Sequence, residues 1–241
     1  MNIDLNCDMG ETIGNDEEIM PYVTSANIAC GIHAGDEASM RNTIRLAKKH
    51  GVAIGAHPGW NDREGFGRRE MSLAPEEVQV LILRQISRLS TIARAEGVEL
   101  LHVKPHGALY NQAAKDPTLA TAIARAVKRF GQNLILVGLA GSRLVEAGIE
   151  SGLRVANEGF PDRNYHPDGT LIARKQENAI LESPEAVAAH AVRLTQQGIY
   201  MEGRQVQVDT LCLHGDHPEA ARNAKLVHEA LKELGIKIAA L

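Results

Sequence analysis

One arrangement recurs along the chain and constrains its fold more than any other feature. A helix-like segment ends at a glycine, a short apolar strand follows, and a polar, glycine-rich loop comes next. Glycine adopts the left-handed backbone conformation that closes many helices, so it marks their ends. Strand-like sequences begin after Gly51, Gly97, Gly131, Gly152 and Gly235. Short buried strands that alternate with helices are typical of a parallel sheet covered by helices.

Further elements complete this pattern. Two strands are expected at 2–7 and 26–30, and another at 206–213, after a segment IYMEGRQ that predicts a short hairpin. Capping residues before Pro117, Pro184 and Pro218 indicate helix starts. The expected helices span residues 36–50, 75–96, 117–130, 142–150, 184–197 and 218–234.

These elements predict an α/β fold: a single-domain, TIM-like β/α barrel of about seven parallel strands. Residues 1–241 contain no linker or shift in composition, so we expect one domain. The C-terminal segment IKIAAL is the weakest of the strand predictions, and it could fill a gap in the barrel wall. A doubly wound open sheet is the alternative, but LNCDMGE after the first strand is not the GxGxxG turn typical of that fold.

Composition excludes several classes of protein. The net charge of −4 and an aromatic content of 3% give no support for a nucleic-acid partner. No apolar run approaches the length of a membrane span. The three cysteines form no CxxC pair, and the N-terminus does not resemble a signal peptide. We therefore expect a cytoplasmic protein with no membrane partner.

Polar residues gather where the predicted strands end, and in parallel α/β folds the active site lies at those carboxyl ends. Successive strands deliver Asn6, Asp8 and Glu11; His33 and Asp36; His57 with Asp62, Arg63, Arg68 and Arg69; Lys104 and His106; Glu158, Asp162 and Arg163; and His214 and Asp216. Six such loops would converge on one mouth of a barrel.

Lys104 stands out because it lies in an apolar strand, where a buried ammonium group requires a partner. His106 shares its face, while His102 lies deeper on that face and is expected in the core. The long loop from Glu158 to Ser183 suggests a hairpin-like flap, with HPDGT as a turn and LIAR as a short strand. The histidines expected to be solvated, on helices, are His50, His190 and His228.

Two chemistries fit these residues. In the first, a divalent metal activates water for amide hydrolysis, and its ligands are Asp8, His33, His57 and His106. In the second, Asp and His groups act as acid and base without a metal, and Lys104 stabilises an oxyanion or a phosphorylated intermediate.

At these motifs the chain resembles the LamB/YcsF family. The resemblance covers nearly the whole chain and rests on six ordered motifs: LNCDMGE, SANIACGIHAGD, GAHPGWNDREGFGRR, VKPHGALYN, EGFPDRNYHPDGTLIARK and LCLHGDHPEA. It implies a seven-stranded, TIM-like barrel related to glycoside hydrolases and polysaccharide deacetylases.

The resemblance also implies an activity: ATP-dependent hydrolysis of 5-oxoproline (pyroglutamate), a lactam, to L-glutamate, with ADP and phosphate released. ATP is then the co-substrate, with magnesium as the divalent metal that accompanies it. The implied partners are the B and C subunits of a 5-oxoprolinase. The chain has no GxxxxGK[ST] motif, so any ATP site is not a P-loop.

On the basis of this resemblance we assign catalytic roles to Asp8, His57, Lys104 and His106. Lys104 and one of Arg68 or Arg69 would neutralise carboxylate or phosphate charge, and Asp8 with His57 or His106 would move protons. The residues assigned to cofactor binding are Asn6, His33, Arg68, Arg69, His214 and Asp216. Two rival functions stay open: a metal-dependent deacetylase or amidase, and a non-catalytic subunit that presents substrate to its partners.

Overall fold

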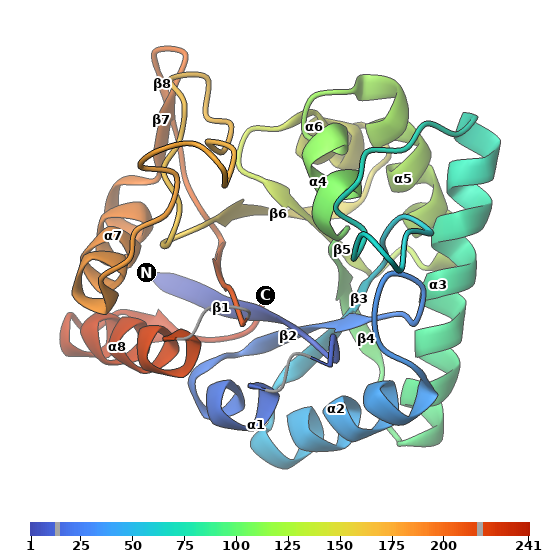
Figure 1. Ribbon diagram of the computed structural model, residues 1–241, viewed down its shortest axis with the longest axis horizontal. Coiled ribbons are helices and arrows are strands. Elements are labelled where there is room, and N and C mark those ends of the chain that lie inside the picture. The colour runs from blue at the N-terminus through green and yellow to red at the C-terminus, as the bar shows by residue number, and fades with distance from the viewer. Residues whose placement is uncertain (13–14, 216–218) are drawn as a thin grey trace.

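The computed structural model describes residues 1–12, 15–215 and 219–241, and within them seven parallel strands close into a barrel with helices outside (Figure 1). The strands are β1 (Asn2–Met9), β2 (Ser25–Ala29), β3 (Ala53–His57), β4 (Leu100–Val103), β5 (Ile135–Leu139), β6 (Arg154–Gly159) and β9 (Thr210–Leu213). They pair in that order, and β9 pairs with β1. This closure confirms the predicted TIM-like barrel and excludes the open sheet.

The C-terminal strand does not form part of the closed wall. Residues Asp4–Cys7 of β1 pair directly with Thr210–Leu213 of β9, which leaves no gap to fill. The strand β10 (Lys237–Ile238) pairs with the first residues of β1, below the point where β9 joins it. The side chain of Leu241 then packs against Ile135 and Val137 and covers the amino-terminal end of the barrel.

The six long helices lie close to their predicted positions. They are α2 (Glu37–His50), α3 (Pro75–Ala95), α5 (Pro117–Phe130), α6 (Arg143–Glu150), α7 (Pro184–Gln197) and α8 (Ala220–Glu233). Asp36 caps α2 by accepting a hydrogen bond from the Ser39 amide, and Gly51 ends it with a φ of 69°. The predicted start of the last helix at Pro218 lies outside the described residues.

Short elements account for the differences from the sequence prediction. The helices α1 (Asp16–Ile19), η1 (Met20–Tyr22) and α4 (Gly107–Ala113) were not predicted, because each is too short to show a helical period. The expected hairpin is present as β7 (Ile199–Met201) and β8 (Arg204–Val206). Because β8 takes Val206 into that hairpin, the last barrel strand begins at Thr210 and not at 206.

Each barrel strand presents one face to the helices and the other to the interior. In β1 the residues Leu5, Cys7 and Met9 join the large apolar core under the helices. The alternate residues of β1 point inward, where the Asn6 amide reaches Glu158 and Thr210 across the barrel. The interior on this side is therefore a hydrogen-bonded polar core.

Two histidines illustrate how this packing treats buried imidazoles. His102 is buried as predicted, and its Nε2 lies 2.7 Å from Oδ1 of Asn27. A Cβ at Gly55 would lie 2.2 Å from the His102 ring, so only glycine fits beside it. The prediction that His190 is solvated was wrong: it faces inward on α7, and its Nδ1 lies 2.9 Å from the Pro161 carbonyl oxygen.

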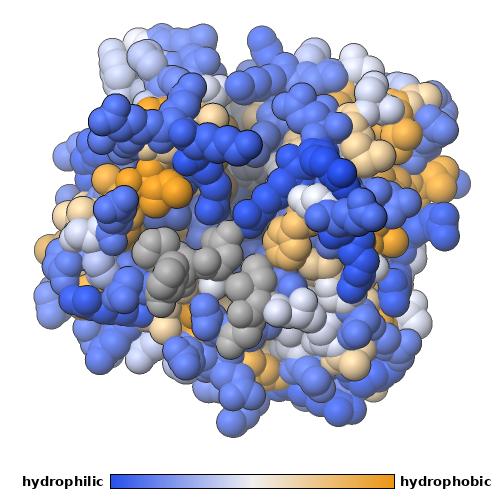
Figure 2. All heavy atoms as spheres, in the orientation of Figure 1, coloured by the Kyte–Doolittle hydropathy of each residue, from blue (hydrophilic) through white to orange (hydrophobic). Residues whose placement is uncertain are grey.

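The surface at the mouth of the barrel is mostly hydrophilic (Figure 2). Among the described residues, no helix combines the length and the apolar character that crossing a bilayer requires.

An ion-pair cluster joins α2 to α3 and should make that junction sensitive to acid. The Glu96 carboxylate lies 2.9 Å from Arg41 and 2.8 Å from Arg45, and these guanidinium groups lower the pKa of Glu96 from 4.5 to about 2. Because the folded pKa lies below the unfolded value, the stabilisation is present above about pH 4.5 and is lost as the pH falls toward 2. The variant Glu96→Gln should therefore unfold at lower urea than the wild type at pH 6, and this gap should close by about pH 2.5. A gap of equal size at both pH values would contradict this account.

Candidate active site

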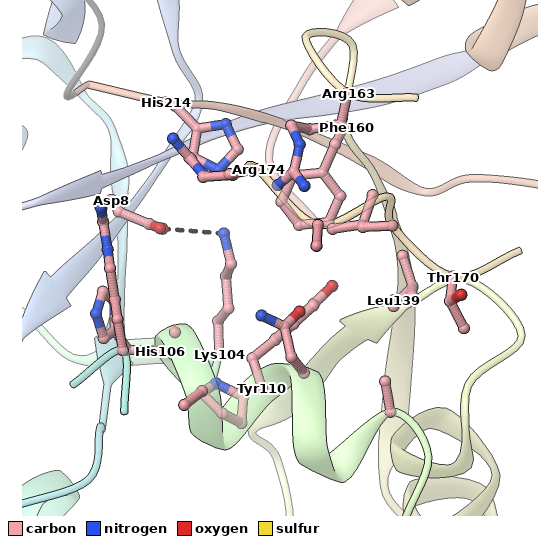
Figure 3. Close-up of a pocket in the computed structure, with 18 of the residues that line it drawn as sticks. Asp8, Lys104, His106, Tyr110, Leu139, Phe160, Arg163, Thr170, Arg174 and His214 are labelled. Carbon is pink, nitrogen blue, oxygen red and sulfur yellow. Dashed lines mark hydrogen bonds and ion pairs between the residues drawn. The ribbon is translucent and has the colours of Figure 1, made fainter. Parts of the chain in front are cut away.

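A cavity of about 390 Å³ opens at the carboxyl ends of the barrel strands (Figure 3). Asp8 reaches it from β1, His57 from β3, and Lys104 and His106 from the segment after β4. The structure therefore brings together the four side chains to which we assigned catalytic roles. The loop after β6 closes the opposite side with Arg163, Thr170 and Arg174.

Lys104 forms the centre of the cavity floor, with its side chain 3% exposed. Its Nζ lies 2.9 Å from Oδ1 of Asp8 and 2.8 Å from Oε1 of Glu158. It also donates to Oδ1 of Asn6 and lies 3.0 Å from the Cys212 sulfur. These contacts satisfy the buried ammonium group, as its position in an apolar strand required.

The same contacts fix the charge of Lys104. Burial alone would lower the pKa of Lys104, but the neighbouring carboxylates of Asp8 and Glu158 raise it well above its usual value. Burial would raise the pKa of Asp8, and His57 and Lys104 together hold it well below its ordinary range. At neutral pH the Lys104 ammonium therefore stabilises negative charge and does not act as a base.

A chain of amides and rings positions these charged groups from below. The Asn27 amide donates to Oδ1 of Asn6 and to Oδ1 of Asp8, and its own oxygen lies against the His102 ring. The Tyr110 hydroxyl donates to Glu158 over 2.6 Å. Asn6, which we had assigned to cofactor binding, thus lies buried among these supporting groups and does not line the cavity.

The two neighbouring arginines differ in position. Arg68 lines the cavity, with its guanidinium carbon 5.1 Å from the centre of the Phe66 ring. Arg69 instead pairs with the Asp62 carboxylate, which also accepts hydrogen bonds from the backbone of its own loop. Of the two residues that we left as alternatives, the geometry favours Arg68 as the group that meets an anion.

His214 lies at the cavity rim, where its Nδ1 is 2.6 Å from Oδ2 of Asp162 and its ring stacks on Phe160. Burial would raise the pKa of Asp162, but the nearby His214 lowers it. Asp216, the other candidate of this loop, lies outside the described residues.

The loop after β6 carries a turn that covers one side of the opening. A bridge joins Tyr165 to Leu171, and the carboxylate of Asp168 accepts a hydrogen bond from the Thr170 amide inside the turn. The predicted flap is therefore present, although the expected strand LIAR pairs only through its first residue.

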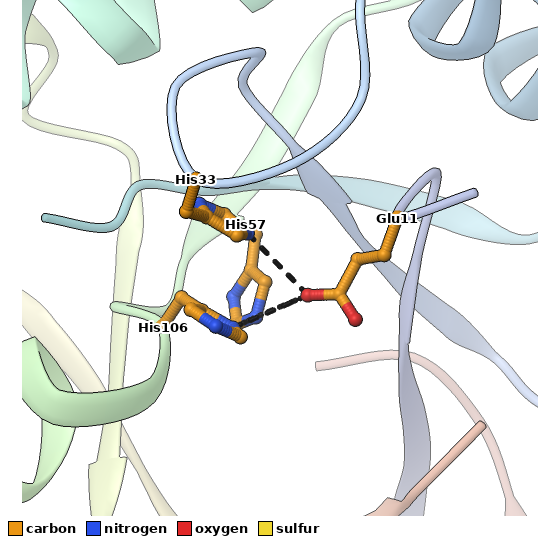
Figure 4. Close-up of side chains that lie close together, drawn as sticks. All are labelled: Glu11, His33, His57 and His106. Atoms are coloured by element: carbon orange, nitrogen blue, oxygen red, sulfur yellow. Dashed lines mark hydrogen bonds and ion pairs between the residues drawn. The ribbon is translucent and has the colours of Figure 1, made fainter. Parts of the chain in front are cut away.

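A second cluster adjoins the cavity and comprises Glu11, His33, His57 and His106, which we call the tetrad (Figure 4). One possible ligand atom from each lies within 4.8 Å of those of the others, so the tetrad could hold a metal ion. Burial raises the pKa of Glu11 but contacts with His106 and His33 lower it to about 2, and burial lowers the pKa of His33 to about 4. At neutral pH these two groups are therefore a carboxylate and a neutral imidazole.

The tetrad corrects the ligand set that we derived from the sequence. Its carboxylate is Glu11 and not Asp8, because the loop after β1 returns Glu11 toward His33 while Asp8 Oδ1 contacts Lys104. Sequence reasoning placed Glu11 and Glu158 at strand ends but gave them no role, and it missed Asn27 and Tyr110. A polar residue inside the apolar run SANIAC was the available signal for Asn27.

Comparisons with known proteins agree with this picture. The chain matches the LamB/YcsF family over residues 3–241. It is 49% identical to the A subunit of 5-oxoprolinase from Pyrococcus furiosus, over 99% of this chain and 97% of that one. A crystal structure of a lactam utilization protein from Thermus thermophilus superposes with a TM-score of 0.92 at 45% identity, over the full length of both chains. A peptidoglycan deacetylase from Bacillus subtilis, 11% identical with a TM-score of 0.51 over 98% of this chain and 86% of that one, shares the fold alone.

Lys104 holds the interior together, and its removal should be costly. The variant Lys104→Met leaves the carboxylates of Asp8 and Glu158 buried without a cation, so we expect a loss of about 3–5 kcal/mol in unfolding free energy. The double variant Lys104→Met/Glu158→Gln should recover part of this loss, because it removes one of the unpaired charges. Urea denaturation at neutral pH measures both effects.

The exposed Lys115, which lines the outer part of the same cavity, provides a matched control. Lys115→Met should change the unfolding free energy by no more than about 0.5 kcal/mol. A double variant no more stable than Lys104→Met would show that charge pairing is not the source of the loss.

Proposed function

The chain belongs to the LamB/YcsF family, and from that premise we propose that it acts as the A component of a 5-oxoprolinase. The reaction is the ATP-dependent hydrolysis of 5-oxoproline to L-glutamate. The observation that carries the proposal is the fixed Lys104 cation at the floor of a cavity in a chain that matches such proteins over nearly its full length.

The cavity suits a small lactam that carries one carboxylate. Its volume of about 390 Å³ lies at the lower end of the range for small-molecule sites. Arg68 lines its wall and can meet the substrate carboxylate, while Lys104 at the floor can meet the lactam oxygen or a phosphate attached to it. The side chains of Leu139 and Phe160 supply apolar surface for the ring.

A five-membered lactam is an unactivated amide, so coupling to ATP has a chemical reason. The lactam oxygen attacks the γ-phosphorus of ATP, an O–P bond forms, and ADP leaves. Water then adds to the ring carbon, the C–N bond breaks, and the nitrogen takes a proton, which gives an acyl phosphate. A second water releases phosphate and leaves the carboxylate of L-glutamate. The C–N bond must break before phosphate departs, because earlier loss of phosphate would re-form the lactam.

The residues of this chain fit specific parts of that sequence. The Lys104 ammonium stabilises negative charge on the oxygen attached to the ring carbon. Asp8 is ionised and its Oδ2 lies 3.3 Å from Nε2 of His57, so this pair is placed to accept a proton from the attacking water. His214 at the rim is our candidate for contact with the nucleotide phosphates.

The assembly is part of the proposal. The matching relatives are named as one lettered component of 5-oxoprolinase, which supports work within a multi-subunit enzyme, and we expect B and C subunits to be the partners. The sequence has no P-loop, so we expect ATP, with its magnesium, to be bound in another way.

One observation favours a second candidate function, a metal-dependent amidase. The tetrad offers three imidazoles and a carboxylate beside the cavity, a donor set that suits metal-assisted hydrolysis. This alternative expects the isolated chain to open the lactam without ATP. Turnover by the isolated chain without nucleotide, abolished by a chelator, would favour it over the proposed function.

The first test of the proposed function concerns Asp8. In the reconstituted three-subunit complex, Asp8→Asn should lower kcat for ATP-coupled glutamate formation by about 100-fold or more, since it removes the charge that receives the proton. Folding of the variant is checked by its urea midpoint. Near-normal turnover by a folded Asp8→Asn complex would remove this role.

The second test uses the adjacent arginines. Arg68→Ala should raise the KM for 5-oxoproline by roughly 10- to 100-fold, as expected for loss of a charge-assisted contact with the carboxylate. Arg69→Ala removes the same group one residue away, where it pairs with Asp62, and should raise KM less. Equal effects of the two variants would show that Arg68 does not read the carboxylate.

A further inference from the structure

The spacing of the tetrad matches the coordination shell of a small cation. Oε1 of Glu11 lies 3.2 Å from Nδ1 of His106, 3.4 Å from Nε2 of His33 and 3.8 Å from Nε2 of His57. Nδ1 of His106 lies 3.0 Å from Nε2 of His57. A tetrahedral zinc ion with bonds near 2.1 Å separates its ligand atoms by roughly 3.4 Å. The four measured separations scatter around that value.

Hydrogen bonds outside the tetrad determine which ring nitrogens carry lone pairs into it. Nδ1 of His57 lies 2.8 Å from the carbonyl oxygen of Lys104, and Nε2 of His106 lies 2.8 Å from that of Phe66. A carbonyl oxygen only accepts, so both of these nitrogens hold a hydrogen. In the neutral rings, Nε2 of His57 and Nδ1 of His106 are then lone pairs that face each other across 3.0 Å. Such an arrangement requires a cation between them.

His33 adds a buried polar group that the protein does not satisfy. It is 1% exposed, its ring stacks on that of His106 with centroids 3.9 Å apart, and its Nδ1 has no hydrogen-bond partner among the described residues. The loop after β3 is shaped around these rings. A Cβ at Gly59 would lie 2.6 Å from the His33 ring, and one at Gly67 would lie 2.9 Å from the His106 ring.

The charges beside the tetrad also favour a divalent cation. Three carboxylates, from Asp8, Glu11 and Glu158, lie within this buried region with the ammonium group of Lys104. Formally these four groups leave two negative charges in a setting where unpaired charge is costly.

We propose that Glu11, His33, His57 and His106 bind a divalent transition-metal ion of the zinc class. Three imidazoles with one carboxylate suit zinc, cobalt or nickel, whereas magnesium prefers oxygen ligands and water. The ion is therefore distinct from the magnesium expected with ATP. Because His57 and His106 also line the cavity, the ion would lie at its edge. This inference goes beyond the proposed function and stands without it.

A shared proton is the rival explanation for the close nitrogens. A protonated His57 has one hydrogen at Nε2, yet three acceptors surround that atom: His106 Nδ1 at 3.0 Å, Asp8 Oδ2 at 3.3 Å and Glu11 Oε1 at 3.8 Å. One proton cannot satisfy all of these, and it leaves His33 unchanged. A cation at the centre of the tetrad meets every one of the four ligands.

The test is metal binding by the whole purified chain, with zinc and cobalt as the probes. After removal of metal with a chelator and dialysis, we expect one equivalent of zinc per chain by elemental analysis on refilling. Cobalt(II) should saturate at one equivalent with the intense visible absorption of a tetrahedral site. Refilling should also raise the thermal midpoint, because the ligands are assembled only in the folded chain.

Variants then locate the site. Glu11→Gln and His33→Ala should each weaken zinc binding by roughly 100-fold or more, through loss of one ligand of four. Glu11→Gln preserves side-chain size, so it carries the test even where His33→Ala does not fold. His190→Asn alters a buried histidine outside the tetrad and should keep one tight equivalent.

Zinc below one equivalent in the wild type, a weak octahedral cobalt spectrum, or equal weakening by His190→Asn would each overturn the proposal and support the shared proton. Metal binding with no lactam turnover in the complex would instead contradict the proposed function alone.

Discussion

The structure depends on one buried cation. Lys104 places an ammonium group inside the barrel, where removal from water is costly, and the chain compensates with Asp8 and Glu158 at 2.9 and 2.8 Å. Those partners come from β1 and β6, on opposite sides of β4 in the pairing order, so the charge network ties the interior together across the barrel. The cavity floor is rigid for the same reason, and a rigid floor keeps a charge in place for a reacting group.

The position of this network follows from the two-residue period of the strands. Alternate residues of β1 supply the apolar layer under the helices, and the residues between them supply Asn6 and Asp8 inside. The other half of the interior is apolar, with Ile135 and Val137 at its base. The barrel therefore has one charged side and one apolar side, and the cavity opens where they meet.

Sequence reasoning predicted the barrel and the convergence of Asp8, His57, Lys104 and His106, because both follow from strand periodicity and from the rule that sites lie at strand ends. It could not distinguish Arg68 from Arg69, since adjacent loop residues differ only in which way the loop turns them. It named Asp8 as a metal ligand where the structure has Glu11, because loop conformation after a strand has no sequence period. Gly55 shows the same limit, since its need appears only once His102 is seen against it.

Asp8 connects the two halves of the site and restricts what each can do. Its Oδ1 contacts Lys104 and its Oδ2 lies 3.3 Å from Nε2 of His57, which also faces Glu11 in the tetrad. If a cation occupies the tetrad, it takes the Nε2 lone pair of His57, and that ring can no longer accept a proton. Nδ1 of His106 is withdrawn in the same way. The proton of the attacking water then has to go to Asp8, the remaining base at the cavity floor that keeps a lone pair facing the substrate. Metal occupancy and the choice of base are therefore a single question in this protein, and the geometry of Asp8 is what joins them.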